Sequence, residues 1–204
     1  MVIKTDYNAL VLVGAWNKSI FSPEWVSKFL LPNEKTFTVE LSLNIDASPR
    51  ISCENIRIWA IGNKLNFTLR DTKDETFELI QNLAIKTADY LPHTPVTSFG
   101  INFIFENDVN ENLSEIFKLN DTKRLIEFGA SIETKQLKHS IIIEEKLINF
   151  TVSIDSIIKF ELNFHFNISN LIEFKELIIS NNILDLKRMA LSIMREVYSL
   201  ELNE

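Results

Sequence analysis

Glycine, proline and cysteine are scarce in this chain of 204 residues, which has only 4 glycines, 5 prolines and 1 cysteine. None of the glycines lies in a GxGxxG or GxxxxGK(S/T) loop, and no GxSxG occurs. These absences argue against nucleotide-dependent enzymes and against the usual serine hydrolases. Cys53 stands alone, so the chain has no internal disulfide. So few glycines and prolines also disfavour long flexible linkers.

Basic clusters and long apolar runs are missing as well. The formal net charge is -7, and the longest basic cluster is the pair Lys187–Arg188, so we expect no nucleic-acid partner. No apolar stretch is long enough to span a membrane, and the N-terminus lacks the pattern of a signal peptide. We therefore expect a cytoplasmic protein with no membrane partner. The bias toward Ile, Asn, Lys and Phe suggests a bacterial source.

What the chain does contain is enough apolar material for a sizeable core, at 46% hydrophobic residues. Strands and helices alternate in the first half. Residues 8–15 read as a buried strand, and Ser22 followed by Pro23 is a good start for a helix that ends before Pro32. Residues 36–45 alternate apolar and polar side chains, which predicts a strand with one dry and one wet face.

A hairpin and a helix complete this half. Gly62–Asn63 is a tight-turn signal between the strands 52–61 and 64–70. Residues 73–90 carry an apolar stripe at helical spacing. Pro92 and Pro95 then make "LPHTP" a stiff crossover into a strand over 97–106.

The second half repeats this theme. We expect a short helix over 110–119, a strand over 122–136 bent at Gly129, a long strand over 157–168, and helices over 170–180 and 182–201. Residues 140–146 and 148–155 form a further strand pair.

These elements predict an α+β fold, an extended antiparallel sheet with helices packed on one face. Because the order of elements occurs twice, we expect two related halves, 1–108 and 109–204, packed as one compact body.

Three histidines are the first candidates for chemistry. His93 lies on the proline-bracketed loop, where it is either a rigidly held base or ligand or, as we favour, a polar loop residue. His165 shares one strand face with Glu161, Asn163 and Asn167, which is either a polar ladder that binds a partner or a solvated strand face. His139 reads as a turn residue. Their separation argues against a metal site, and no cofactor is expected.

Carboxylates and the cysteine offer weaker candidates. Glu144 and Glu145 are neighbours on a predicted strand, so they point to opposite faces and form no paired-carboxylate site. Cys53 has no local base that would activate it, so a half-buried strand cysteine is the expected state.

Trp59 is the most distinctive aromatic residue, because alternation places it with Arg57 on the wetter face of its strand. There it either anchors a partner or is covered by the other half of the chain.

Taken together, these features favour a non-enzymatic protein-binding module, such as a bacterial immunity or antitoxin-type protein or an accessory subunit of a complex. The expected partner is another protein, and an exposed strand edge would also favour a homodimer. The alternative is a small-ligand-binding protein or an enzyme whose site is assembled around His93 or His165.

Overall fold

The structure, a computed structural model, describes residues 1–109, 113 and 122–202. Its centre is one antiparallel sheet of ten strands in the order β3-β4-β5-β6-β2-β7-β10-β9-β8, with β1 also paired to β7. The strands are β1 (Val2–Ile3), β2 (Tyr7–Gly14), β3 (Thr38–Glu40), β4 (Arg50–Ser52), β5 (Ile56–Ile61), β6 (Lys64–Leu69), β7 (Val96–Asp108), β8 (Lys135–Ile143), β9 (Lys146–Ile154) and β10 (Ile157–Asn167). The sheet confirms the predicted α+β class.

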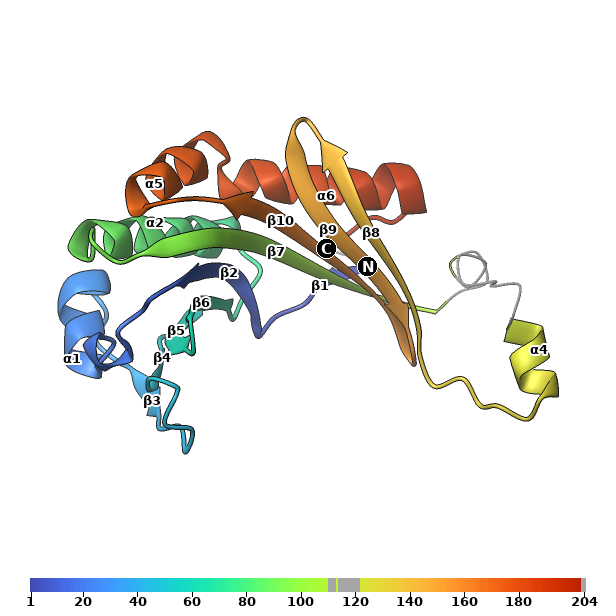
Figure 1. Cartoon of the computed structure of the whole chain (residues 1–204), viewed down its shortest axis with the longest axis horizontal. Helices are drawn as coiled ribbons and strands as arrows, with labels where there is room; N and C mark the ends of the chain where they lie inside the picture. Colours follow the sequence, from blue (N-terminus) through green and yellow to red (C-terminus); the bar gives the residue numbers. More distant parts are fainter. Residues whose placement is uncertain (110–112, 114–121, 203–204) are drawn as a thin grey trace.

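Helices cover one face of this sheet. The helices and helical turns are η1 (Lys18–Ile20), α1 (Pro23–Trp25), η2 (Val26–Leu30), α2 (Asp74–Tyr90), α4 (Thr122–Glu127), α5 (Leu171–Ser180) and α6 (Ile183–Tyr198). Figure 1 shows α2, α5 and α6 side by side on the same side of the sheet. We call the opposite surface the helix-free face. None of the described helices has the length and apolar character needed to cross a membrane.

The sheet is curved, so the helix-free face is the inside of an arch (Figure 1). At one end the strands β3 and β4 turn away from the helices and form one arm. At the other end the segment that carries α4 extends in the same general direction and forms a second arm. We call these the β3–β4 arm, residues 38–52, and the α4 arm, residues 122–134.

Local sequence signals explain where the main helices begin and end. Asn182 caps α6, because its side chain accepts a hydrogen bond from the Leu184 amide at 2.8 Å. Helix α2 begins with acidic residues that suit its N-terminal dipole, and it ends at the cap residue Leu91, directly before Pro92. The crossover predicted for "LPHTP" is therefore confirmed.

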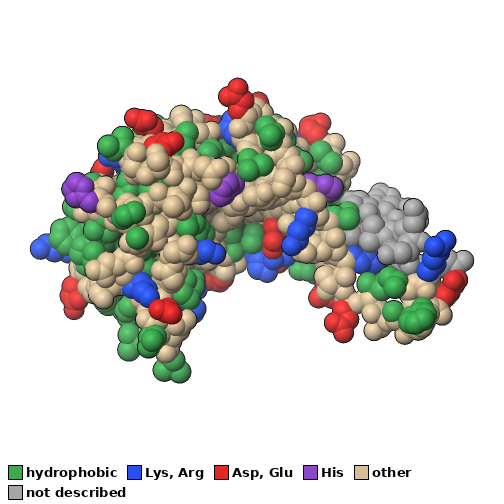
Figure 2. All heavy atoms as spheres, viewed as in Figure 1, with side chains coloured by type: hydrophobic (Ala, Val, Ile, Leu, Met, Phe, Trp, Pro, Cys, Tyr) green, Lys and Arg blue, Asp and Glu red, His purple; other side chains and the backbone are tan. Residues whose placement is uncertain are grey.

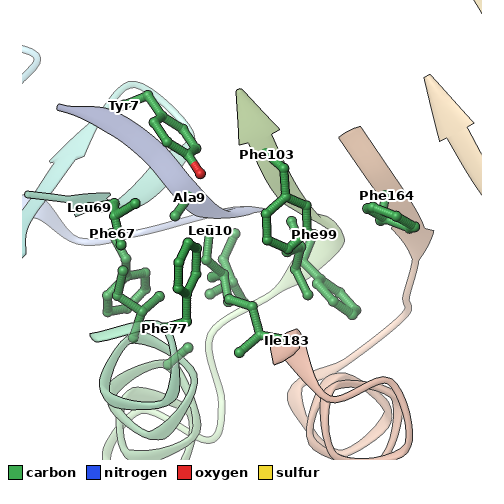
Figure 3. Close-up of a cluster of buried hydrophobic side chains, with 14 of the residues drawn as sticks. Tyr7, Ala9, Leu10, Phe67, Leu69, Phe77, Phe99, Phe103, Phe164 and Ile183 are labelled. Carbon is green, nitrogen blue, oxygen red and sulfur yellow. The ribbon is translucent and has the colours of Figure 1, made fainter. Parts of the chain in front are cut away.

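The core lies between the sheet and the three helices. The alternation of β10 is confirmed, since Phe160, Leu162 and Phe164 are buried. The ring centroids of Phe77 on α2 and Phe103 on β7 are 5.8 Å apart, so the helix and the sheet meet through aromatic rings (Figure 3). Burial of each such side chain contributes about 1.5–3 kcal/mol, which fixes the register of every central strand.

The predicted strand over 36–45 is wrong in length. Only Thr38–Glu40 pair with β4, and the apolar side chains that follow are solvent-exposed, at 81% for Leu41, 102% for Leu43 and 94% for Ile45. The backbone is diverted into local turns instead. The Ser42 hydroxyl accepts from the Asn44 amide at 3.0 Å, and such bonds compete with a strand ladder. The short β3 is an edge strand, whereas β10 is central.

The predicted strand over 122–136 is also wrong. Thr122–Glu127 form the helix α4, and Gly129, at φ +96°, ends it. The Gly129 amide donates to the Ile126 carbonyl at 2.9 Å, as expected of a glycine that follows a helix. The strand begins only at Lys135. The helix expected over 110–119 lies outside the described residues, apart from Leu113.

Candidate functional site

A row of asparagines crosses the helix-free face. Asn149 on β9 donates to the Asn163 side-chain oxygen on β10 at 3.2 Å, and Asn163 donates to the Asn102 side-chain oxygen on β7 at 2.7 Å. Asn102 in turn donates to the backbone oxygen of Asn8 on β2 at 2.7 Å. We call these four residues the asparagine row. It joins four adjacent strands, of which β2, β7 and β10 are far apart in sequence.

Other polar side chains extend the row at both ends. On β8, Ser140 donates to the Asn149 side-chain oxygen at 3.1 Å. On β6, the Thr68 hydroxyl donates to the Asn8 side-chain oxygen at 2.8 Å, and the Trp59 indole on β5 donates to Thr68 at 3.4 Å. Polar contacts therefore run across seven strands, from β8 to β5.

Gly100 makes the position of Asn163 possible. A Cβ atom at Gly100 would lie 2.5 Å from the side-chain nitrogen of Asn163, which is closer than real Cβ contacts allow. In a strand, glycine often marks a place where another group approaches closely. Here the approaching group is the central carboxamide of the asparagine row.

The row forms part of the wall of a hollow of about 340 Å³. Its lining comes from β2, β7, β9 and β10, the four strands that carry the row. The residues that line it are Tyr7, Asn8, Val11, Asn102, Phe103, Ile104, Asn149, Thr151, Glu161, Leu162 and Asn163. The hollow thus combines carboxamides, hydroxyls and one carboxylate with a few apolar residues, so its lining is more polar than that of most ligand sites.

Tyr7 is the buried polar residue of this wall. Its side chain lies on the side of β2 opposite α2, with the hydroxyl directed toward β7 (Figure 3). The residue is 7% exposed, and its hydroxyl has no hydrogen-bond partner among the described residues. Burial raises the pKa of the Tyr7 phenol well above its usual range. The nearby Ile104 backbone lowers this pKa by a smaller amount, but its contact with the hydroxyl does not have the geometry of a hydrogen bond. The phenol therefore stays protonated.

Charges at the hollow are balanced in pairs. The Glu161 carboxylate contacts the Lys159 ammonium two residues away on β10. Farther along the same face, Lys4 pairs with Glu106. The hollow is therefore close to neutral, although the chain as a whole is acidic.

The predicted binding residues fall into two groups. Glu161 and Asn163 line the hollow, on the strand face where the sequence placed them. His165 lies on the same face but outside the lining, and its Nε2 is 3.1 Å from the Asn167 side-chain oxygen. His93 is exposed on the loop between α2 and β7 and also lies outside the hollow.

Trp59 and Arg57 share a face of β5, as predicted, and both are half-buried. The guanidinium of Arg50 lies 4.7 Å from the centroid of the Trp59 ring. Arg57 donates to the Ser52 hydroxyl at 3.1 Å and lies 3.5 Å from Glu40. Both side chains are thus engaged within the chain.

Two minor predictions need correction. His139 is not in a turn but in β8, where its ring centroid is 6.4 Å from that of Phe150. Glu144 and Glu145 are not strand residues either. They form the two-residue turn of the β8–β9 hairpin, with φ values of 46° and 63°.

Cys53 is buried, and burial raises the pKa of its thiol above the usual range, so it is not an activated nucleophile. Among the described residues, no three His, Cys, Asp or Glu side chains come together in a way that could hold a metal ion.

Sequence reasoning missed the other polar residues of this lining, namely Tyr7, Asn8, Asn102, Asn149 and Thr151. A signal was present, because asparagine is disfavoured in strands and yet lies within five of the described strands here. What the sequence could not supply was the strand order that brings these residues together.

Exposed apolar side chains gather on the two arms. Leu41, Leu43 and Ile45 project from the β3–β4 arm, and Leu125, Ile126 and Phe128 from the α4 arm, where Phe128 is 90% exposed. Figure 2 shows hydrophobic side chains at both arms, at the lower left and lower right, with the molecule hollowed between them.

Compared with protein-family models, with curated proteins and with solved structures, the chain shows no match.

Proposed function

We propose that this chain is a non-enzymatic protein-binding module that binds its partner between the two arms. The observation that carries the proposal is the exposure of large apolar side chains on both arms. Folding buries almost none of the side-chain surface of Leu43 and Phe128, which remain 102% and 90% exposed. Contiguous exposed apolar groups on a soluble protein commonly mark an interaction site.

The partner that fits this surface is a protein with an apolar patch for each arm. Burial of one leucine or phenylalanine side chain contributes about 1.5–3 kcal/mol, and each 1.4 kcal/mol is a tenfold change in affinity. Two or three such side chains would offset much of the cost of association. A bacterial immunity or antitoxin-type protein, or an accessory subunit of a complex, would act in this way.

The test is capture of the partner with matched variants. The tagged full chain is used to isolate its stoichiometric partner from an extract of the source organism, and the intact complex is weighed. Leu43→Asp and Phe128→Asp should each weaken binding of that partner by about tenfold or more. Ile172→Asp is the control, because Ile172 is also 67% exposed but lies on α5, over the other face. Equal loss of binding in all three variants, or in none, would contradict the proposal.

A second copy of the chain is the other partner that we consider. At one end of the sheet, β8 is an edge strand of nine residues, and Ile142 on it is 74% exposed. A long exposed edge can pair with another edge strand. The same mass measurement separates the two cases, since a homodimer through β8 forms without any other protein and is insensitive to Phe128→Asp.

A further inference from the structure

The asparagine row keeps unused hydrogen-bonding capacity. A carboxamide has two N–H donors and two acceptor lone pairs. Within the described residues, Asn102, Asn149 and Asn163 each donate one hydrogen bond and accept one through their side chains. Each therefore retains one donor and one acceptor, and neighbouring strands repeat this arrangement at about 4.8 Å.

The bonds within the row also fix the orientation of these amides. The side-chain oxygens of Asn102 and Asn163 each accept from the N–H of the neighbouring asparagine, and that of Asn149 accepts from the Ser140 hydroxyl. Gly100 leaves the space that Asn163 occupies. A ligand would therefore meet groups that are already ordered, so that little side-chain entropy is lost on binding.

Tyr7 contributes to the wall of the hollow with a covered hydroxyl. Leaving a buried hydroxyl without a hydrogen-bond partner costs free energy, and for this reason most buried polar groups in proteins are paired. Tyr7 lines the hollow and its hydroxyl is unpaired within the described residues. Because the oxygen is covered, it is not in reach of a ligand in the hollow, and the groups offered to a ligand are the carboxamides of the row.

We infer that the hollow binds a neutral small molecule that carries several hydroxyl or amide groups and is about the size of one sugar ring. Hydroxyls and amides both donate and accept, as the free positions of the row require. Glu161 can accept from a hydroxyl. Because Lys159 already pairs with Glu161 and the lining residues include no Lys or Arg, the hollow offers no cation to an anionic ligand. The volume of about 340 Å³ is at the small end of ligand sites.

This site is separate from the two arms and does not rest on the proposed function. Its residues lie in the sheet, whereas Leu43 and Phe128 lie outside the hollow. Leu43→Asp should therefore leave ligand binding unchanged, so failure of one proposal does not imply failure of the other.

The experiment is a titration of the isotope-labelled full chain, followed by amide chemical shifts. The neutral probes are myo-inositol and N-acetylglucosamine, and glucuronate is the anionic comparison. We expect the neutral probes to shift side-chain and backbone amides of Asn102, Asn149 and Asn163, with a Kd of about 0.1–1 mM. Glucuronate should bind at least about tenfold more weakly, because its carboxylate would lose water without meeting a cation among the lining residues.

Variants locate the site. Asn163→Ala should weaken binding of the neutral probes at least about tenfold, since it breaks the row at its centre. Asn107→Ala is the matched control, because Asn107 is also on β7 but does not line the hollow. The backbone spectrum of each variant shows whether the fold is kept.

Three results would overturn the inference. The first is the absence of shifts with either neutral probe up to about 20 mM, which covers millimolar affinities. The second is binding that Asn163→Ala leaves intact. The third is a response to the neutral peptide N-acetyl-triglycine amide and to neither of the other probes, which would assign the hollow to an extended peptide instead.

Discussion

Removing one atom, the hydroxyl oxygen of Tyr7, should make this protein more stable. The Tyr7 ring lies on the side of β2 opposite α2 and is only 7% exposed, while its hydroxyl has no partner among the described residues. Leaving a buried donor unsatisfied costs about 1–3 kcal/mol, whereas phenylalanine keeps the ring and its contacts. We therefore expect Tyr7→Phe to raise the free energy of unfolding by about 1 kcal/mol.

Thermal unfolding is the simplest assay for this change. For a domain of this length, 1 kcal/mol corresponds to about 2–4 °C in Tm. Tyr90→Phe is the matched control, because Tyr90 is 51% exposed and its hydroxyl can meet water. That variant should stay within about 0.5 kcal/mol of the parent. A lower Tm for Tyr7→Phe would refute the reasoning, since it would mean that the hydroxyl has a partner in solution.

The same variant has a signature in the pH dependence of stability. Burial raises the pKa of Tyr7 above its ordinary value of 10.0, so the folded chain keeps the proton after the unfolded chain has lost it. The stability is therefore fully present below pH 10.0 and falls as the pH rises beyond it. Tyr7→Phe should reduce this loss in urea unfolding at alkaline pH, and an unchanged loss would contradict the assignment.

Two further predictions concern packing. Gly100→Ala should destabilise the fold by about 1–3 kcal/mol, because the new Cβ would collide with the Asn163 amide. Much of this loss should disappear in the double variant with Asn163→Ala. Additive losses of the free energy of unfolding in urea would show that the two positions do not interact. Lys187→Ala should cost about 2 kcal/mol in the same assay, because its buried ammonium lies 4.7 Å from the centroid of the Phe77 ring and 2.6 Å from the Asp74 carboxylate. An effect below about 0.5 kcal/mol would mean that this side chain contributes little.

The sequence predicted those elements whose local signals agree with their burial. Helix α2 has an apolar stripe, acidic residues at its start and a proline after its end, and all three act in the structure. The hairpin at Gly62 and the alternation of β10 were equally well specified. In each case the local sequence pattern and the packing in the folded chain favour the same structure.

The errors arose where a pattern had no packing partner. Residues 41–45 alternate as a strand should, but none of the described strands pairs with them, and local hydrogen bonds from side chains determine the backbone. Residues 122–127 contain Leu125 and Ile126, which suggested a strand, yet both side chains are exposed and the segment is helical. The asparagine row could be predicted only in part, since Asn163 was placed correctly but its neighbours depend on the strand order.

The central position of β7 has a consequence for how the chain folds. This strand pairs with β1 and β2, which precede it, and with β10, which ends at residue 167. During synthesis, one edge of β7 must therefore remain unpaired until most of the chain has emerged. Pairings between such distant segments form slowly, and an unpaired apolar strand is prone to aggregate. We expect refolding to be slow and to depend on protein concentration, with the docking of β10 against β7 as the late step.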